Sequence, residues 1–209
     1  MKTFLFQGDS ITDANRDDDN LINSGLGCGY AFMLASEFDK KGNTEMNFIN
    51  RGDSGDRITD VYARIKEDII NLKPDYMSIL IGVNDVSHEL TMNCGVITEK
   101  FRKIYRMLID EIIESLPQIK IIILEPFVLK GTCTEKLWDD FNTEVRKRAE
   151  ASKQIAEEYN FTFVPLQDKF DSLSSDGNVS YWSVDGIHPT QAGHAVIKDE
   201  LMQALLSII

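Results

Sequence analysis

The sequence predicts an α/β fold in which a parallel β-sheet is covered by helices on both faces. Two observations carry this prediction: short apolar runs recur along the chain, and segments with the apolar spacing of helices separate them. Helices of this length between successive strands imply crossover connections, which join parallel strands. A sheet connected in this way is buried on both of its faces.

Five apolar runs are expected to form the strands of this sheet: 3–6, 46–49, 76–81, 119–124 and 161–164. Helical spacing is clearest in five further segments: 30–40, 58–71, 98–115, 135–159 and 190–206. Proline supports these boundaries, because Pro74 follows the second helical segment, Pro117 follows the third, and Pro189 precedes the last.

The composition is that of one globular domain spanning residues 1–209. The chain has 209 residues, of which 43% are hydrophobic and 27% charged, and it contains no repeat or linker.

The net charge of -12 disfavours nucleic acid as a partner and weakly favours neutral or cationic substrates. No run is long enough to span a membrane, and no apolar leader precedes the first strand, so we expect a cytoplasmic protein without a membrane partner. A homo-oligomer is compatible with these features.

Metal and disulfide chemistry are not expected. The three cysteines are odd in number and have no metal-ligand spacing, so free thiols are predicted at Cys28, Cys94 and Cys133. The polar segment 13–29 resembles the start of a calcium loop, with acidic or amide side chains at alternate positions. However, Asp18 stands where that loop requires glycine, and Ser24 stands where it requires glutamate. We expect this segment to form one wall of a pocket.

A glycine-acid-serine turn follows the first predicted strand and presents the hydroxyl of Ser10. A serine in such a turn is often only a turn or capping residue. As a nucleophile it needs a base, an acid that orients the base, and donors for an oxyanion. Asp185 and His188, three positions apart near the other end of the chain, have the spacing of an acid that fixes the tautomer of an imidazole.

Two more segments supply candidate oxyanion donors, each directly after an apolar run. Gly52 offers a backbone N–H, although it could simply form a tight turn, and Asn84 offers a side-chain amide. In a doubly wound sheet the carboxyl ends of the strands face the ligand, so Ser10, Gly52 and Asn84 should meet there. Acidic residues adjacent to these positions are expected to brace the loops: Asp9, Asp53 and Asp85.

Four blocks in this order, containing Ser10, Gly52, Asn84 and His188, resemble those of the SGNH (GDSL-type) serine hydrolases. The resemblance implies a flavodoxin-like three-layer α/β/α fold with strand order 2-1-3-4-5. It also implies a catalytic triad of Ser10, Asp185 and His188, an oxyanion hole formed by Ser10, Gly52 and Asn84, and no cofactor. His188 is favoured as the base over the other two histidines because its Asp-x-x-His-Pro context matches the family.

Four further stretches are similar to the intracellular acetylxylan esterases of this family: 27–30, 64–68, 73–75 and 125–127. This similarity implies a serine esterase that removes short acyl groups, acetyl above all, from carbohydrates such as xylo-oligosaccharides, through an acyl-enzyme at Ser10. Tyr181 and Trp182 precede the acid and the histidine, and could either bind a sugar as a platform or anchor their loop to the core.

Two alternatives stay open at the level of the sequence. A lysophospholipase or thioesterase of the same family would need an apolar tunnel for its acyl chain, and the polar residues of 13–23 argue mildly against one. A carbohydrate-binding protein that retained the fold without catalysis would have no need of the complete set of family residues.

Overall fold

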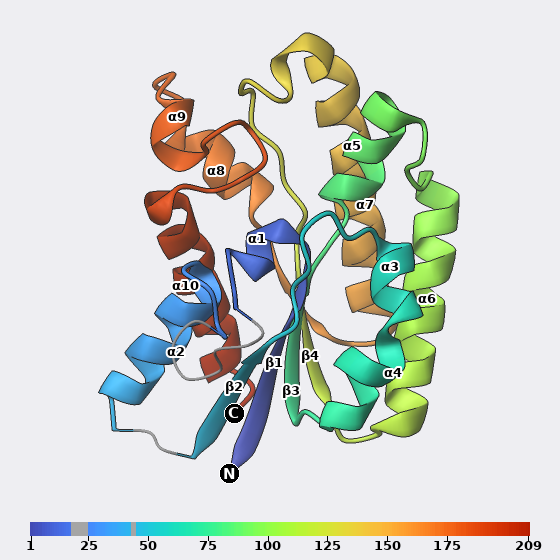
Figure 1. The fold of residues 1–209 in the computed structure, drawn as a ribbon, viewed down its shortest axis with the longest axis vertical. Coiled ribbons are helices and arrows are strands. Elements are labelled where there is room, and N and C mark those ends of the chain that lie inside the picture. Colours follow the sequence, from blue (N-terminus) through green and yellow to red (C-terminus); the bar gives the residue numbers. More distant parts are fainter. Residues whose placement is uncertain (18–24, 43–44) are drawn as a thin grey trace.

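A five-stranded sheet forms the centre of the fold, with all strands parallel and in the order β2-β1-β3-β4-β5 (Figure 1). The structure is a computed structural model and describes residues 1–17, 25–42 and 45–209. The strands are β1 (Lys2–Gly8), β2 (Met46–Asn50), β3 (Tyr76–Leu80), β4 (Lys120–Leu124) and β5 (Thr162–Val164). The five predicted strands and their predicted order are confirmed.

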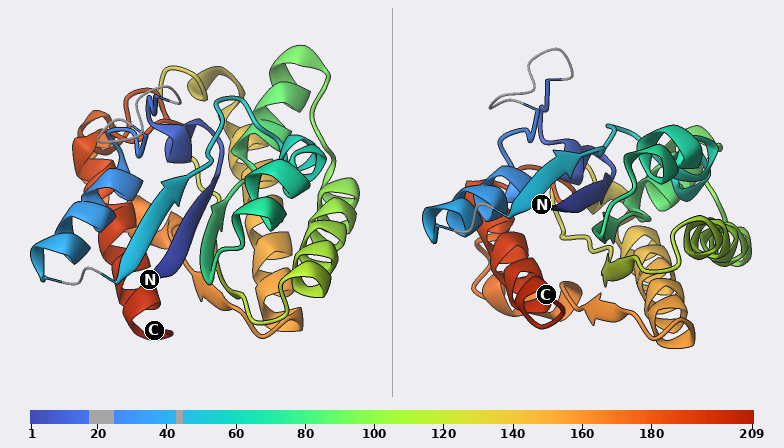
Figure 2. Two further views of the ribbon diagram at one scale, coloured as in Figure 1. Left: turned by 60° about the horizontal axis from the view of Figure 1, so that its bottom comes forward. Right: turned by 90° about the horizontal axis from the view of Figure 1, so that it is seen from below.

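Helices cover both faces of the sheet, so that the molecule has three layers (Figure 2). One face is covered by α2 (Tyr30–Lys40) and α10 (Gln191–Leu206). The other is covered by α3 (Ile58–Ala63), α4 (Ile65–Asp68), α6 (Thr98–Ser115) and α7 (Trp138–Glu158). The remaining elements are α1 (Ser10–Asp13), α5 (Val83–Met92), α8 (Gln167–Leu173), α9 (Val179–Trp182) and the 3₁₀ turns η1 (Ile70–Leu72) and η2 (Glu135–Leu137).

Helix α6 shows why the periodic segments form helices against the sheet. Its buried side chains recur three or four positions apart and therefore lie on one face: Phe101, Ile104, Tyr105, Leu108, Ile109 and Ile112. This face packs on the apolar side chains of β3 and β4 together with α3 and α7. The helix spans the range that the sequence predicted.

The predicted helix over 58–71 is wrong in one respect, because the structure divides it into α3, α4 and η1. Arg64 separates α3 from α4 with a backbone conformation outside the helical region, at φ -102° and ψ 10°. Its guanidinium contacts three aspartates that precede and follow it in the chain. The apolar spacing of the segment continues across this break, so periodicity could not reveal it.

Short helices at the carboxyl edge of the sheet were not predicted. Among them, α1 begins at Ser10, and α5 carries Asn84 at its second position. Four residues are too few for a periodic signal in α1, and only four of the ten residues of α5 are buried. Both helices nevertheless decide how the two side chains are presented.

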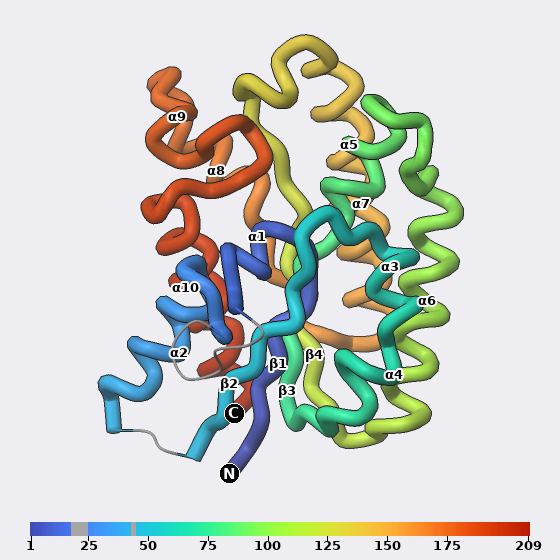
Figure 3. The backbone as a smooth tube through the Cα atoms, viewed as in Figure 1, coloured from blue at the N-terminus to red at the C-terminus, as the bar shows by residue number. Residues whose placement is uncertain are grey.

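The carboxyl ends of three neighbouring strands meet at one edge, as predicted. The register pairs Phe6 of β1 with Asn50 of β2, and Gly8 of β1 with Leu80 of β3. The segment after β2 runs past α1 before it enters α3 (Figure 3). A hydrogen bond of 3.0 Å from the N–H of Asp53 to the carbonyl oxygen of Gly8 joins this segment to β1. The loops that follow β1, β2 and β3 therefore border a common space.

None of the helices in the described ranges combines the length and the apolar character that crossing a membrane requires.

The packing of α6 predicts a sharp contrast between two adjacent residues. Leu108 is completely buried and Met107 is 40% exposed. Leu108→Ala should lower the free energy of unfolding by about 2–5 kcal/mol, because it removes buried methyl groups and leaves a cavity. Met107→Ala should change it by no more than about 0.5 kcal/mol. Urea unfolding of both variants measures the difference, and equal effects would show that the buried face of α6 is assigned wrongly.

Candidate active site

Ser10 is held at the start of α1 by a sharp turn from β1. The residue before it, Asp9, caps the helix: its Oδ1 accepts a hydrogen bond of 3.0 Å from the N–H of Ile11. Gly8 is required at the turn, because a Cβ there would lie 2.3 Å from Oγ1 of Thr12 and 2.4 Å from the carbonyl oxygen of Leu80. The turn thus presents the hydroxyl of Ser10 at the edge of the sheet.

A chain of hydrogen bonds connects Ser10 to the two residues predicted from the far end of the sequence. Oγ of Ser10 lies 3.0 Å from Nε2 of His188, and Nδ1 of His188 lies 2.8 Å from Oδ2 of Asp185. Because a carboxylate only accepts hydrogen bonds, Nδ1 donates to Asp185 and Nε2 is left to accept the hydroxyl proton of Ser10. This geometry is that of a nucleophile, a general base and an orienting acid.

Asp185 is kept ionised by the backbone around it. Burial alone would raise the pKa of this carboxyl, but the backbone N–H of His188, the imidazole of His188 and the backbone N–H of Ile187 together lower the pKa below its ordinary value. The two backbone hydrogen bonds, of 2.8 Å and 2.9 Å, reach Oδ1 and leave Oδ2 for the imidazole. The carboxylate is therefore fixed in the charged form that an imidazolium requires.

The loop that carries these two residues is closed upon itself. Oγ of Ser183 donates to the carbonyl oxygen of His188 and accepts from the N–H of Gly186. Gly186 adopts φ +101°, and a Cβ there would lie 2.5 Å from the carbonyl oxygen of Leu129. The turn between Asp185 and His188 is therefore set by packing against the segment after β4.

Asn84 lies in the first turn of α5, where its side chain is almost completely buried. Its Nδ2 donates a hydrogen bond of 3.1 Å to the carbonyl oxygen of Asp56, which leaves the second hydrogen of the amide for a substrate. The backbone N–H of Ser10 has no acceptor among the described residues. Both groups have the capacity for oxyanion binding that the sequence predicted.

The structure contradicts the predicted role of Gly52. Its N–H donates a hydrogen bond of 2.9 Å to Oδ1 of Asn50, and its α-carbon packs against Thr12 and Asp13 so closely that a Cβ would clash with both. Gly52 thus allows the segment after β2 to approach α1, which is the turn-forming alternative. The family block contains a second glycine, Gly55, which was not among the predicted site residues.

Gly55 has the properties that Gly52 lacks. It adopts φ +91°, a conformation that favours glycine, and the position of a Cβ there faces open space. Its N–H has no acceptor in the part of the chain that the structure describes. The next residue, Asp56, provides the carbonyl oxygen that binds Asn84. Gly55 is therefore the better candidate for the backbone donor, and its place between a serine and an aspartate in the same block was the available signal.

A cleft of about 580 Å³ opens beside Ser10 and His188. The other described residues that line it are Ala14, Asn15, Cys28, Ser54, Val184, Pro189, Thr190, Gln191 and His194. Hydroxyl, amide and imidazole groups stand among short apolar side chains in this lining. The cleft is therefore suited to a ligand with hydroxyl groups. Residues 18–24 of the predicted wall lie outside the described residues, and only the two ends of segment 13–29 can be placed.

His194, one of the two histidines not favoured as the base, lines the cleft beside His188. Its Nδ1 accepts a hydrogen bond of 3.3 Å from the N–H of Tyr30, and its ring stacks on Tyr30. Burial, and then the charge of His188, lower the pKa of His194 to about 4. The ring is therefore neutral at pH 7, and because Nδ1 accepts, Nε2 carries the proton.

The predicted aromatic platform is only partly compatible with the structure. Trp182 packs against the core and donates its Nε1–H to the carbonyl oxygen of Leu173 at 2.9 Å, so it anchors its loop. Tyr181 is 56% exposed and lies against Trp182 in an edge-on arrangement. Neither ring is among the described residues that line the cleft. A sugar contact remains a prediction for Tyr181 alone.

The acids next to the site brace its loops. Burial raises the pKa of Asp85 to about 8, and both of its oxygens accept from the N–H of Ile58 at the start of α3. Burial likewise raises the pKa of Asp9 to about 7. Asp53 contacts Arg64. The third histidine, His88, has a pKa lowered by burial and does not line the cleft.

The described residues contain no group of three or more histidine, cysteine or acidic side chains arranged to hold a metal ion. Asp18 and Ser24, on which the comparison with a calcium loop depended, lie outside the described residues. The three cysteines are exposed free thiols. Cys28 lines the cleft, and Sγ of Cys133 lies 3.5 Å from Oδ2 of Asp185.

Most of the chain is similar to known proteins. Residues 6–196 match the GDSL-like Lipase/Acylhydrolase family. An acetylxylan esterase from Geobacillus stearothermophilus is 32% identical in an alignment 208 residues long. The alignment covers 92% of this chain and 89% of that protein. A crystal structure of a GDSL-like protein from Parabacteroides merdae superposes with a TM-score of 0.91 at 33% identity, covering 97% of this chain and 94% of the other.

The solved structure of Axe2, an acetylxylan esterase from Geobacillus stearothermophilus, superposes with a TM-score of 0.87 at 29% identity and covers 98% of this chain and 94% of that one. Variants of Axe2 in which a serine, an aspartate or a histidine is replaced are described as catalytic mutants. The replaced aspartate and histidine are three positions apart in Axe2, as are Asp185 and His188 here.

The low pKa of His194 predicts a pH-dependent contribution to stability. In the unfolded chain this imidazole takes up a proton near pH 6.5, whereas in the folded protein it does so only near pH 4. Stability should therefore be lost as the pH falls from 6.5 to 4, by at most about 3 kcal/mol from this group. His194→Phe keeps a ring against Tyr30 but cannot bind the proton. Urea unfolding at pH 7, 5.5 and 4.5 should show that the variant loses less free energy of unfolding than the wild type as the pH falls. An equal pH dependence in the two proteins would contradict the lowered pKa of His194.

Proposed function

Because the chain belongs to the GDSL-like lipase/acylhydrolase family and is a carboxylic ester hydrolase, we propose that it removes acetyl groups from carbohydrates such as acetylated xylo-oligosaccharides. The observation that carries the proposal is the hydrogen-bonded chain of Ser10, His188 and Asp185 beside a cleft with polar lining. The acetylxylan esterase relative supports the choice of substrate class.

In the first half of the reaction, Oγ of Ser10 attacks the ester carbonyl while Nε2 of His188 takes the hydroxyl proton. Asp185 holds the imidazole in the correct tautomer and stabilises the imidazolium that forms. The tetrahedral intermediate then loses the sugar alcohol, whose oxygen takes the proton from Nε2 of His188. The acetyl group remains on Ser10 as an ester.

The negative charge of the tetrahedral intermediate is stabilised by preformed donors. Ser10 and Gly55 provide backbone N–H groups without another acceptor in the described chain, and Asn84 provides the free hydrogen of its amide. Because these donors are fixed before the substrate binds, they stabilise the charge without reorganisation during the reaction.

Water completes the cycle in a second half-reaction that uses the same base and the same oxyanion donors. His188 removes a proton from a water molecule, whose oxygen attacks the acetyl carbonyl, and the second intermediate releases acetate and restores Ser10. None of these steps uses a cofactor.

We assign the protein to the cytoplasm, on the argument that three exposed free thiols suit a reducing compartment.

The cleft favours a sugar ester over the long acyl chain of a lysophospholipid or thioester. Hydroxyl, amide and imidazole groups from Asn15, Thr190, Gln191 and His194 are available to the alcohol part of the substrate. A long acyl chain would instead need a continuous apolar lining. The neutral Nε2–H of His194 can donate to a hydroxyl or ring oxygen without adding a second positive charge beside His188.

The role of Ser10 predicts a large loss of activity without loss of the fold. Ser10→Ala removes one partly buried atom, the attacking oxygen itself, so turnover of 4-nitrophenyl acetate should fall by several orders of magnitude while the thermal unfolding temperature stays near that of the wild type. Residual rates near 10³-fold over water would reflect the remaining oxyanion donors. A phosphonate inhibitor should label the wild type at Ser10, which peptide mass spectrometry can check. Wild-type kcat in the variant would refute the nucleophile.

The proposed substrate predicts how the rate depends on acyl length. An acetyl-specific site has no room for a longer acyl group, so each added methylene would forgo the roughly 0.8 kcal/mol that its burial could contribute. Values of kcat/KM should fall from acetyl through butyryl to octanoyl 4-nitrophenyl esters, and acetylated xylo-oligosaccharides should be deacetylated efficiently. A preference for octanoyl would favour a lipid or thioester hydrolase and leave the triad assignment unchanged.

A further inference from the structure

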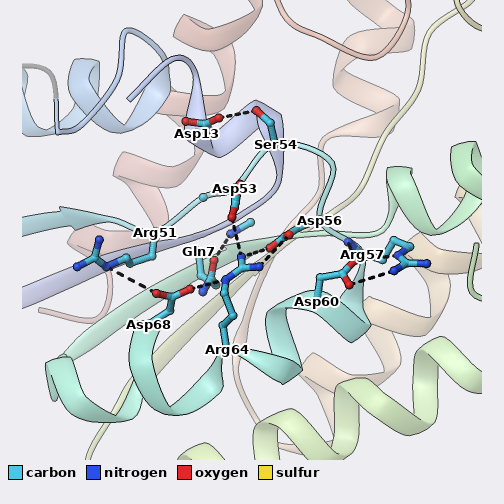
Figure 4. A network of polar contacts seen from close by, with 12 residues as sticks. Gln7, Asp13, Arg51, Asp53, Ser54, Asp56, Arg57, Asp60, Arg64 and Asp68 are labelled. Atoms are coloured by element: carbon cyan, nitrogen blue, oxygen red, sulfur yellow. Dashed lines mark hydrogen bonds and ion pairs between the residues drawn. The ribbon is translucent and has the colours of Figure 1, made fainter. Parts of the chain in front are cut away.

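Arg64 is the centre of a polar network beside the active site that the proposed reaction does not use. Figure 4 shows its guanidinium between Asp53, Asp56 and Asp68. It binds both oxygens of Asp56, one of them at 3.2 Å, and its Nε donates to Asp68 at 2.8 Å. Its Nη2 lies 3.5 Å from the carboxylate of Asp53. One side chain therefore contacts two residues of the loop after β2 and one residue of α4.

The two loop residues that Arg64 contacts are the ends of a single turn. The N–H of Asp56 donates to the carbonyl oxygen of Asp53 at 3.1 Å and closes the turn 53–56. Gly55, with its free N–H and φ of +91°, lies within this turn. A guanidinium has a planar fork of donors that suits two carboxylates at once, whereas an ammonium does not.

The same turn is connected to the reacting groups on its other sides. The carbonyl oxygen of Asp56 accepts from Nδ2 of Asn84 and so orients that amide. The hydroxyl of Ser54 donates to the carboxylate of Asp13 in α1, the helix that begins with Ser10 (Figure 4). A shift of this turn would thus move Gly55 and Asn84 relative to Ser10.

We propose that Arg64 is a positioning residue, which clamps the turn 53–56 so that the N–H of Gly55 and the amide of Asn84 are held ready for the oxyanion. The catalytic part of this inference rests on the function proposed above, and the structural part does not. Side-chain burial strengthens the clamp at the Asp56 end of the turn, where the carboxylate is 7% exposed, whereas the carboxylate of Asp53 at the other end is 52% exposed. Pairs that are screened from water in this way hold their geometry better than exposed ones.

The kinetic test compares Arg64→Met with Arg106→Met. Arg106 is a suitable control because it also pairs with a carboxylate, that of Glu158, but on the outer helices α6 and α7. Arg64→Met should lower kcat for 4-nitrophenyl acetate by about 10- to 100-fold with little change in KM, since a small misplacement of catalytic groups is costly. Arg64→Lys should restore only part of this loss, and Arg106→Met should have wild-type kcat. Normal kcat in Arg64→Met below its unfolding temperature overturns the proposal.

A double-mutant cycle separates positioning from an unrelated loss of activity. Asn84→Ala should lower kcat by about 10² to 10³, because it removes one oxyanion donor. If Arg64 acts through this donor, adding Arg64→Met to Asn84→Ala should cost clearly less than it does in the wild type. Fully additive losses overturn the proposal.

A second measurement does not depend on catalysis. In ¹H–¹⁵N NMR spectra, the backbone amide of Gly55 and the side-chain amide of Asn84 should shift or broaden in Arg64→Met and stay unchanged in Arg106→Met. Unchanged signals in Arg64→Met overturn the clamp, whatever the activity. Shifted signals in a protein without Ser10-dependent turnover would support the clamp and refute the proposed function, so the two failures are distinguishable.

Discussion

The candidate active site depends on the parallel pairing of β1 with β2 on one side and β3 on the other. Parallel pairing sends all three strands in the same direction, so the loops that follow them emerge at one edge although they are far apart in the sequence. Each loop brings one component: Ser10 after β1, the turn with Gly55 after β2, and Asn84 after β3. A different strand order would place the nucleophile and the oxyanion donors at separate positions along the edge.

Electrostatics at this edge is controlled by burial and by backbone donors. The chain is strongly acidic, with a net charge of -12, yet the proposed reaction generates a cation at His188 and an anion at the substrate. Asp185 stabilises the cation at His188, because backbone N–H groups hold this carboxylate ionised despite its partial burial. Asp9 and Asp85 lie deeper, and burial raises the pKa of each. Near neutral pH these two carboxyls therefore carry less negative charge toward the oxyanion than exposed acids would.

Neutral histidine and paired arginine complete this arrangement. Burial keeps His194 uncharged next to His188, so the cleft contains a hydrogen-bond donor without a second positive charge that would repel the imidazolium of His188. Arg64 contacts the loop after β2, and its charge is matched by the carboxylates of Asp53, Asp56 and Asp68. The cations of the site are thus balanced locally, which limits their influence on the reacting groups.

The sequence by itself determined the class of fold and the five strands and pointed to the candidate triad, because each of these leaves a local signal. Buried strands produce apolar runs, and Ser10, Asp185 and His188 stand in short motifs with a characteristic spacing. The tertiary structure alone decided which glycine offers a free N–H, since Gly52 and Gly55 lie in the same motif and differ in backbone conformation, packing and hydrogen bonding. It also decided that Trp182 anchors a loop, that His194 faces the cleft, and that Arg64 interrupts a helix. These features arise from contacts between residues distant in the chain, and the periodicity and spacing of a sequence carry no record of such contacts.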